Sequence, residues 1–311
     1  MTFTTRIKEE ISKLDYDKVI VLTELSAFIR YDAKISSQAI TLVIENASVA
    51  RRIYKIIKEI YHNNINVIVR NQKRFRVKQI YILEIKENIK FILEDLNIYK
   101  NNKKTNPQEY FLETKEDKIS FIKGLFLACG SINDPKTSGY HLEFVVSLKK
   151  DALYIQKLLK ELNLSAKVLK RSNKYMIYLK SAEEISDLLK MFNAINNMFY
   201  FEDIRIYRDH KNMVNRLNNC DIANYEKSIN TGLKQLNDIK YLKEHNLVDL
   251  LDDRTKDVLK YREKYPESSY VELAKIVSLE TNKPIGKSGI NHCFIKIKNI
   301  VKKHKEKNIN D

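Results

Sequence analysis

The sequence lacks tryptophan and is poor in glycine, proline and cysteine, with 6 Gly, 4 Pro and 3 Cys in 311 residues. So little glycine and proline excludes collagen-like and low-complexity proteins. Cys129, Cys220 and Cys293 stand alone without paired spacing, which indicates neither a disulfide framework nor a cysteine zinc site. This cysteine pattern fits a reducing compartment, and we expect a cytoplasmic protein.

Long apolar runs are also missing. No stretch approaches the ~20 residues that a membrane-spanning helix needs, and the opening MTFTTRIKEEISKLDYDK has no signal-peptide core. Apolar residues make up 43% of the chain and charged residues 31%, as in globular proteins. The length exceeds the usual size of a single core, so we expect two or three domains and no membrane association.

Negative charge is in the minority, because 56 Lys and Arg residues oppose 40 Asp and Glu, giving a net charge of +16. Such an excess attracts polyanions, which makes double-stranded DNA the leading class of partner. A coding bias towards Lys, Asn and Ile could produce the same charge without selection for binding. The placement of the basic residues along the chain must therefore distinguish DNA binding from coding bias.

Two apolar octets of similar shape, SAFIRYDA from Ser26 and GLFLACGS from Gly124, each lie on a helix-like segment. Each is followed by a strand-like run, an amphipathic helix, a hairpin and a short closing helix. The repetition predicts an α+β, pseudo-twofold domain built from two αββαββα repeats. Small residues in the octets, which let two helices pack closely at the axis, are Ala27, Gly124, Ala128 and Gly130.

This duplicated order resembles the LAGLIDADG homing-endonuclease fold, with IKGLFLACG where that motif would stand. In that family the last acid of each motif helps to hold the divalent metal ions that cut DNA. The equivalent residues here are Asp32 and Cys129. A thiol is a soft ligand that does not replace a carboxylate for Mg²⁺, so we expect no enzyme activity, no metal and no cofactor. An active endonuclease, the alternative, needs another acid beside Asp32.

Both predicted hairpins carry clusters of basic residues. In the LAGLIDADG fold such strands form a saddle that grips DNA, and basic side chains on a ribbon can contact phosphates. The alternative is a solvated hairpin whose Lys and Arg guard the sheet edge, and the scarcity of base-reading side chains favours it. The candidates for DNA contact are Arg70, Arg74 and Arg76 in the first repeat and Lys170 and Arg171 in the second.

The last segment has the pattern of three helices. Asp252 and Asp253 can cap the first helix, and Ser269 with Glu272 has capping-box spacing at the start of the second. The pattern predicts that the second helix ends at Val277, with a loop from Ser278 to Gly286. The third helix begins near Ser288 and has apolar residues at core spacing, which predicts a helix-turn-helix.

The third helix supplies the main candidates for DNA contact. Its first residues suit base edges, and the lysines that follow suit phosphates. The alternative is a helical bundle with a solvated basic end. The candidates for base contact are Lys287, Ser288, Asn291 and His292, and those for phosphate contact are Lys296, Lys298, Lys302 and Lys303.

The chain divides into five expected parts. They are a first repeat (1–100), a linker (101–116), a second repeat (117–200), a connecting helical segment (201–248) and a helix-turn-helix domain (249–311). Within the connecting segment, the pattern predicts a helix from about Asn219 to about His245.

Three blocks in this order, FIKGLFLACGSINDPKTSGYHLEF, NRLNNCDIANYEKS and KPIGKSGINHCFIKI, are similar to those of the WhiA family of bacterial regulators. The resemblance implies a degenerate LAGLIDADG domain joined to a DNA-reading helix-turn-helix. It implies a nucleoid-associated role in transcription, cell division and chromosome segregation, with sporulation in sporulating relatives. It also implies partners in the transcription or division machinery, and a protein-docking platform is the third alternative. Cys293 and Ile295 stand where members often have basic residues.

Overall fold

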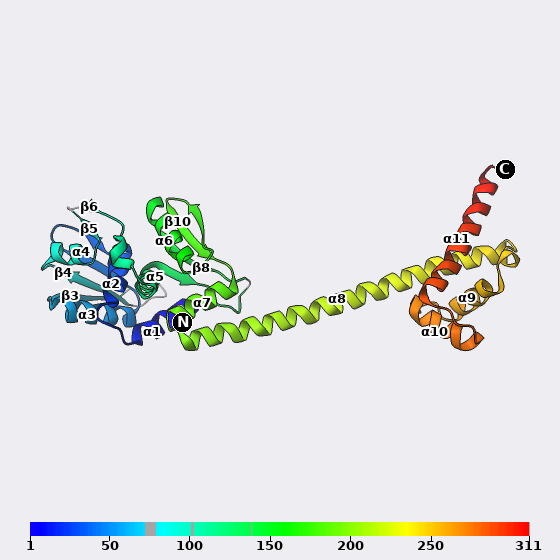
Figure 1. The fold of residues 1–311 in the computed structure, drawn as a ribbon, viewed down its shortest axis with the longest axis horizontal. Coiled ribbons are helices and arrows are strands. Elements are labelled where there is room, and N and C mark those ends of the chain that lie inside the picture. Colours follow the sequence, from blue (N-terminus) through cyan, green and yellow to red (C-terminus); the bar gives the residue numbers. More distant parts are fainter. Residues whose placement is uncertain (72–78, 101–102, 138, 311) are drawn as a thin grey trace. The chain divides into compact units, whose positions relative to one another are not determined.

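The structure is a computed structural model that describes residues 1–71, 79–100, 103–137 and 139–310 (Figure 1). Two compact units make up the chain, unit 1 from Met1 to Arg208 and unit 2 from Asp209 to Asp311. Unit 1 holds both repeats, and unit 2 is helical.

The first repeat is an αββαββα unit with an antiparallel sheet in the order β1-β2-β4-β3. Strand β3, at one edge of this sheet, pairs with β4 in a register that sets Val67 opposite Leu83. The elements are α2 (Val21–Asp32), β1 (Lys34–Ile35), β2 (Ile40–Ile44), α3 (Ala47–Tyr61), β3 (Ile65–Asn71), β4 (Gln79–Ile85) and α4 (Ile89–Asp95).

The second repeat has the same order of elements and a sheet in the equivalent order β7-β8-β10-β9. This agreement confirms the predicted α+β class and the internal duplication. The elements are α5 (Lys115–Cys129), β7 (Gly130–Ile132), β8 (Leu142–Val146), α6 (Lys149–Glu161), β9 (Lys167–Arg171), β10 (Lys174–Leu179) and α7 (Ala182–Met191).

Helices α2 and α5 pack against each other at the seam between the repeats. A Cβ atom added to Gly124 would lie only 2.0 Å from the backbone oxygen of Glu24, so only glycine fits there. The Ser120 hydroxyl crosses the seam and donates to the Ile20 carbonyl at 3.0 Å. The small-residue octets therefore serve the close helix contact that the sequence predicted.

Helix α1 (Phe3–Lys13) has no counterpart in the second repeat and was not predicted. Its apolar face, formed by Phe3, Ile7 and Ile11, is fully buried in the core of unit 1. The Thr4 hydroxyl donates to the Ile132 carbonyl and accepts from the Ile132 amide, which ties α1 to β7. The helix is therefore an integral part of the duplicated unit.

The segment between the repeats is held against the first repeat. It contains β5 (Tyr99–Lys100), β6 (Lys103–Lys104) and a 3-10 turn, Glu109–Leu112. The buried Arg30 guanidinium donates to the carbonyls of Asn97 and Thr105. One side chain of the first octet thereby holds the start of the linker against the first repeat.

Helix α8 (Ile195–Glu244) is one continuous helix. The prediction that the connecting helix starts near Asn219 was wrong, because the helix begins at Ile195. Its first turn is held by the Glu10 carboxylate, which accepts from the backbone amides of Asn196 and Asn197. The start near Asn219 was predicted from apolar spacing, which does not reveal that Glu10 on α1 holds the first turn of α8.

Unit 2 packs the end of α8 against α9 (Asp253–Lys264), α10 (Tyr270–Thr281) and α11 (Lys287–Asn310). Asp252 caps α9 and Ser269 forms a capping box with Glu272, as predicted. The predicted end of the second helix was wrong, because α10 continues to Thr281. Its last turn buries no apolar side chain, so periodicity could not reveal it.

Candidate functional site

The two octet helices end at equivalent positions on the two sheets. Asp32 closes α2 and Cys129 closes α5. The Asp32 carboxylate accepts a hydrogen bond from the backbone amide of Val43 in β2, and the Cys129 sulfur accepts one from the backbone amide of Val145 in β8. The structure therefore places Asp32 and Cys129 as counterparts, as the sequence comparison proposed.

A lysine from α1 lies beside both residues. The Lys8 ammonium donates to the Leu127 carbonyl at 2.9 Å, and its strongest electrostatic partners are Cys129, Asp32 and Glu45. Lys8 is partly buried, and this burial lowers the pKa of its ammonium although Cys129 and Asp32 oppose the shift. Lys8 was missed by the sequence comparison because α1 stands outside the repeats.

Burial also raises the pKa values of the two residues at the helix ends. It raises the pKa of the Asp32 carboxyl to about 6 and that of the Cys129 thiol to about 12. The Asp32 Oδ2 atom is buried without a hydrogen-bond partner in the described part of the chain. At neutral pH Cys129 is therefore a neutral thiol and not a thiolate ligand.

This set of donors does not fit the metal pair of a nuclease. Mg²⁺ takes hard oxygen ligands, whereas the seam offers one carboxylate, one protonated thiol and a partly buried ammonium that repels a cation. Across residues 1–71, 79–100, 103–137 and 139–310, no group of three or more His, Cys, Asp or Glu side chains could hold a metal ion. The seam is suited to packing and not to phosphodiester chemistry.

The basic hairpin residues do not share one face. Val168, two residues before Lys170 on β9, lies opposite the buried Ile177, so Lys170 lies on the helix-covered face of its sheet. Arg171 lies on the opposite, open face, and Arg70 lies at the equivalent position of β3. All three side chains are exposed. Arg74 and Arg76 fall outside the described residues.

Helix α11 buries one face and exposes the other. Ile290, Phe294, Ile297 and Val301 lie in the core of unit 2, as their spacing predicted. The exposed side of its first two turns carries the four predicted base-contact residues, Lys287, Ser288, Asn291 and His292. Asn299, two turns beyond His292, lies on the same exposed face and was not among the candidates, because base contacts were sought only at the start of the helix.

The predicted phosphate contacts are not equivalent to one another. Lys296 donates to Asp252 Oδ2 at 2.7 Å, which joins α11 to the cap of α9 and holds the pKa of Asp252 at about 2. Lys302 lies 3.6 Å from Glu306 on its own helix. Lys298 lines a groove between α11 and the end of α8, together with Asn291. Lys303 is exposed.

The two residues that depart from the family pattern have different surroundings. Cys293 is buried in the core of unit 2, so it cannot contact a ligand from α11. Ile295 is 45% exposed and lies in the same groove as Asn291 and Lys298. Only Ile295 therefore changes the surface of the helix.

The turn before α11 is fixed by polar contacts. The Ser278 hydroxyl accepts from the Ile285 amide at 2.9 Å, and Asn282 adopts a left-handed conformation that ends α10. The Arg262 guanidinium is 1% exposed and donates to the Ser268 carbonyl at 2.7 Å. The Ser278 contact and the left-handed Asn282 thus hold the turn between α10 and α11, and the Arg262 contact holds the turn between α9 and α10.

Comparison with known proteins agrees with this architecture. Models of the WhiA N-terminal LAGLIDADG-like domain, the WhiA LAGLIDADG-like domain and the WhiA C-terminal HTH domain match residues 21–99, 118–211 and 214–301. A probable cell division protein WhiA from Oceanobacillus iheyensis is 36% identical over 312 residues, covering 98% of each chain. The chain belongs to the WhiA family. A Staphylococcus aureus WhiA is also 36% identical, covering 97% of each chain.

Two solved WhiA structures share the fold. The full-length DUF199/WhiA from Thermatoga maritima aligns with a TM-score of 0.58 at 23% identity, covering 97% of this chain and 99% of that one. The N-terminal LAGLIDADG domain of DUF199/WhiA aligns with a TM-score of 0.50 at 22% identity, covering 61% of this chain and 90% of that one. In the described residues, no helix has an apolar stretch long enough to cross a bilayer.

Proposed function

We propose that this WhiA family member is a non-catalytic, sequence-preferring DNA-binding protein that regulates transcription in cell division and chromosome segregation. It reads double-stranded DNA on the nucleoid with the exposed face of α11. The observation that carries the proposal is that Ser288, Asn291 and His292 are exposed on the first turns of a helix whose other face is buried.

The chemistry of these side chains supports base reading. Asn291 can pair with adenine in the major groove, whereas Lys287 can pair with guanine. Lys302 and Lys303, three turns further on, suit the phosphate backbone. The helix thus has base-reading groups near its start and charged groups towards its end.

The test begins by selecting preferred duplexes from a random pool with the full chain. The affinities for the selected duplex and for a scrambled one are then measured at several salt concentrations. The double variant Asn291→Ala/His292→Ala is expected to lose about 10-fold or more of the preference and to bind the scrambled duplex almost as well as the wild type.

The matched control is Lys302→Ala/Lys303→Ala. It is expected to weaken binding to both duplexes equally and to reduce the slope of affinity against salt, because each lysine releases counterions from the phosphates. Equal loss of both duplexes in the Asn291→Ala/His292→Ala variant would show that α11 does not read bases.

The LAGLIDADG-like fold makes DNA cleavage the second candidate function. The seam argues against it, because Lys8 puts a partly buried ammonium beside Asp32 and Cys129. Supercoiled plasmid incubated with the protein and Mg²⁺ or Mn²⁺ is expected to remain uncut. Cleavage that disappears in Asp32→Asn would establish an active nuclease.

A further inference from the structure

The edge strands of the two sheets differ in how they are protected. An unpaired strand edge invites pairing with another strand, and proteins usually block it with charge, proline or a short strand. Strand β9 has such protection, since it spans five residues that include Lys167, Lys170 and Arg171. Strand β3 spans seven residues, INVIVRN, with one charged side chain, Arg70, near its end.

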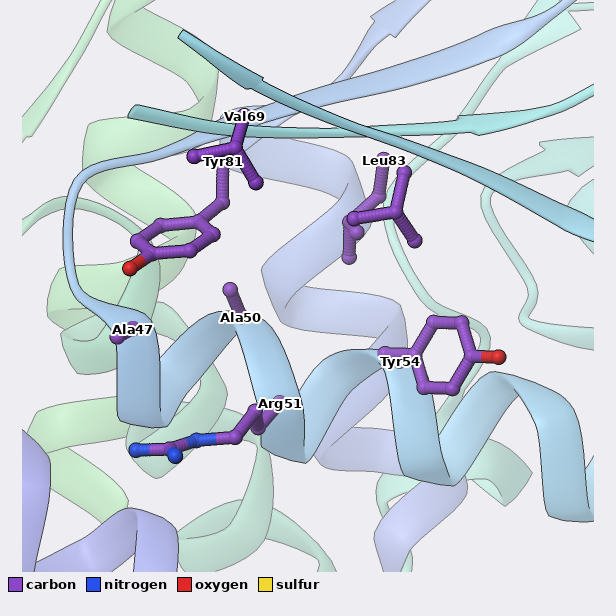
Figure 2. Close-up of a pocket in the computed structure, with 8 residues that line it drawn as sticks. Ala47, Ala50, Arg51, Tyr54, Val69, Tyr81 and Leu83 are labelled. Atoms are coloured by element: carbon purple, nitrogen blue, oxygen red, sulfur yellow. The ribbon is translucent and has the colours of Figure 1, made fainter. Parts of the chain in front are cut away.

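The helix-covered face of β3 is also left partly open. Val67 and Val69 point towards α3, yet they are 46% and 50% exposed. They border an open hollow of about 290 Å³ between α3 and strands β3 and β4. Figure 2 shows Val69, Tyr81 and Leu83 on the strands, facing Ala50 and Tyr54 on α3.

The second repeat carries a charged residue at the corresponding place. The position opposite Tyr81 in the first sheet is Val69, and the position opposite Tyr175 in the second sheet is Lys170. A valine in one repeat is thus a lysine in the other. Exposed apolar side chains on the helix-covered side of the free edge are Val67 and Val69 of β3, whereas the exposed apolar residue of β9, Leu169, lies on the open face of its sheet.

We propose that β3 is a dimerisation edge, at which β3 of a second copy of this chain pairs antiparallel about Ile68. The sequence of β3 fits itself in this register. Val67 of each copy then lies opposite Val69 of the other copy. These two valine pairs cover the exposed valine side chains of both strands. Arg70 comes to lie opposite Asn66 of the partner, so no like charges meet.

Strand β9 cannot pair with itself in the same way. Centred on Leu169, the position equivalent to Ile68, it would set Lys167 opposite Arg171 of the partner and Val168 opposite Lys170. Like charges directly opposite each other destabilise a strand pair. Strand β3 can therefore pair with itself in this register, whereas its counterpart in the second repeat, β9, cannot.

Such a dimer is isologous and closed, because the same strand serves both copies about a twofold axis. A single strand pair buries little area, so the association is weak and concentration-dependent. Two joined copies carry two helix-turn-helix units, which strengthens binding to two half-sites by raising the effective concentration of the second unit. The dimer itself does not rest on the proposed DNA-binding function.

The test uses the full-length chain with the exposed Cys220 replaced by serine. In Ile68→Cys the two introduced thiols face each other across the twofold axis, at a Cα separation of about 5 Å that a disulfide can bridge. Mild oxidation is expected to give a covalent dimer. The matched control is Leu169→Cys, at the equivalent and exposed position of β9, and it is expected to stay monomeric.

A third variant adds Val69→Lys, which copies the residue of the second repeat. It is expected to abolish the Ile68→Cys crosslink and, in the chain without Ile68→Cys, the concentration-dependent dimer seen by analytical ultracentrifugation. Thermal melting checks that the variant remains folded. The proposal is overturned if Ile68→Cys crosslinks no faster than Leu169→Cys, if Val69→Lys leaves the crosslink intact, or if the wild-type chain is monomeric at every concentration.

Discussion

The two repeats share a backbone plan but differ at equivalent positions. In the first repeat, Glu24 and Arg52 form a buried ion pair, with Nε to Oε1 at 2.6 Å and both side chains 1% exposed. The alignment that pairs Asp32 with Cys129 places Phe121 and Tyr154 at the same positions of the second repeat, where the fully buried Phe121 ring packs edge-on against Tyr154, with ring centroids 6.4 Å apart. One core position thus holds a charge pair in one copy and apolar packing in the other.

The difference shows which features the duplicated fold needs. Asp32 and Cys129 differ in chemistry, as do Val69 and Lys170, and yet the elements and sheet orders agree. The close approach of α2 and α5 at Gly124 joins the two repeats. Helix packing at the seam is therefore the requirement, whereas the groups around it have diverged.

The largest expected effect is at the seam itself. In Gly124→Ala the new Cβ would overlap the Glu24 carbonyl, so we expect at least ~4 kcal/mol of lost stability or no folded protein. The control is Gly286→Ala, where a Cβ meets no atom within 4 Å. Urea unfolding measures both variants. A Gly124→Ala protein as stable as Gly286→Ala would contradict the close helix contact.

The buried ion pair offers a sharper comparison. Arg52→Met leaves the Glu24 carboxylate buried, with Lys123 at 4.0 Å as its remaining cation, and is expected to cost about 3 kcal/mol. The double variant Glu24→Phe/Arg52→Tyr copies the Phe121–Tyr154 pair of the second repeat and removes both charges. It is expected to regain most of the loss, as measured by urea unfolding in a double-mutant cycle. If the double variant is no more stable than Arg52→Met, the two repeats are not equivalent at this position.

The smallest effect is the pH dependence that distinguishes Asp32 from Cys129. Burial raises the pKa of Asp32 from 3.8 to about 6, so between these values the folded protein binds a proton that the unfolded chain has released. The free energy of unfolding therefore falls as the pH rises through this window, by at most ~3 kcal/mol from this group. Because the carboxyl is only partly buried, solvent screening makes the effect smaller than this bound.

Asp32→Asn is expected to remove that contribution, which is measured as the difference between the wild type and the variant in unfolding experiments from pH 4 to pH 7. Cys129→Ser is the control, because a thiol with a pKa near 12 does not titrate in this range. Parallel pH profiles for wild type and Asp32→Asn would mean that Asp32 is not withdrawn from water.

Periodicity and repetition predicted much of this molecule. The paired octets, the two hairpins and the closing helices α4 and α7 were recognised because each signal recurs along the chain. The core face of α11 was recognised from the spacing of Ile290, Phe294 and Ile297. Capping residues such as Ser269 also located helix starts correctly.

Other features depend on contacts that sequence spacing does not encode. Helix α1 has no duplicate, so Lys8 could not be connected with Asp32 before the fold placed them together. The last turn of α10 is fixed by the Ser278 hydroxyl and not by apolar burial. The open edge of β3 became visible through the strand order, which puts Val67 and Val69 at the rim.

The most direct test of the account compares α11 with the hairpins in one DNA-binding titration. The full chain, Ser288→Ala/His292→Ala and Arg70→Ala/Arg171→Ala are each titrated with the selected and the scrambled duplex at fixed salt. The account predicts that the α11 variant loses the preference for the selected duplex and that the hairpin variant keeps it. Loss of preference in the hairpin variant, with α11 unaffected, would contradict the account.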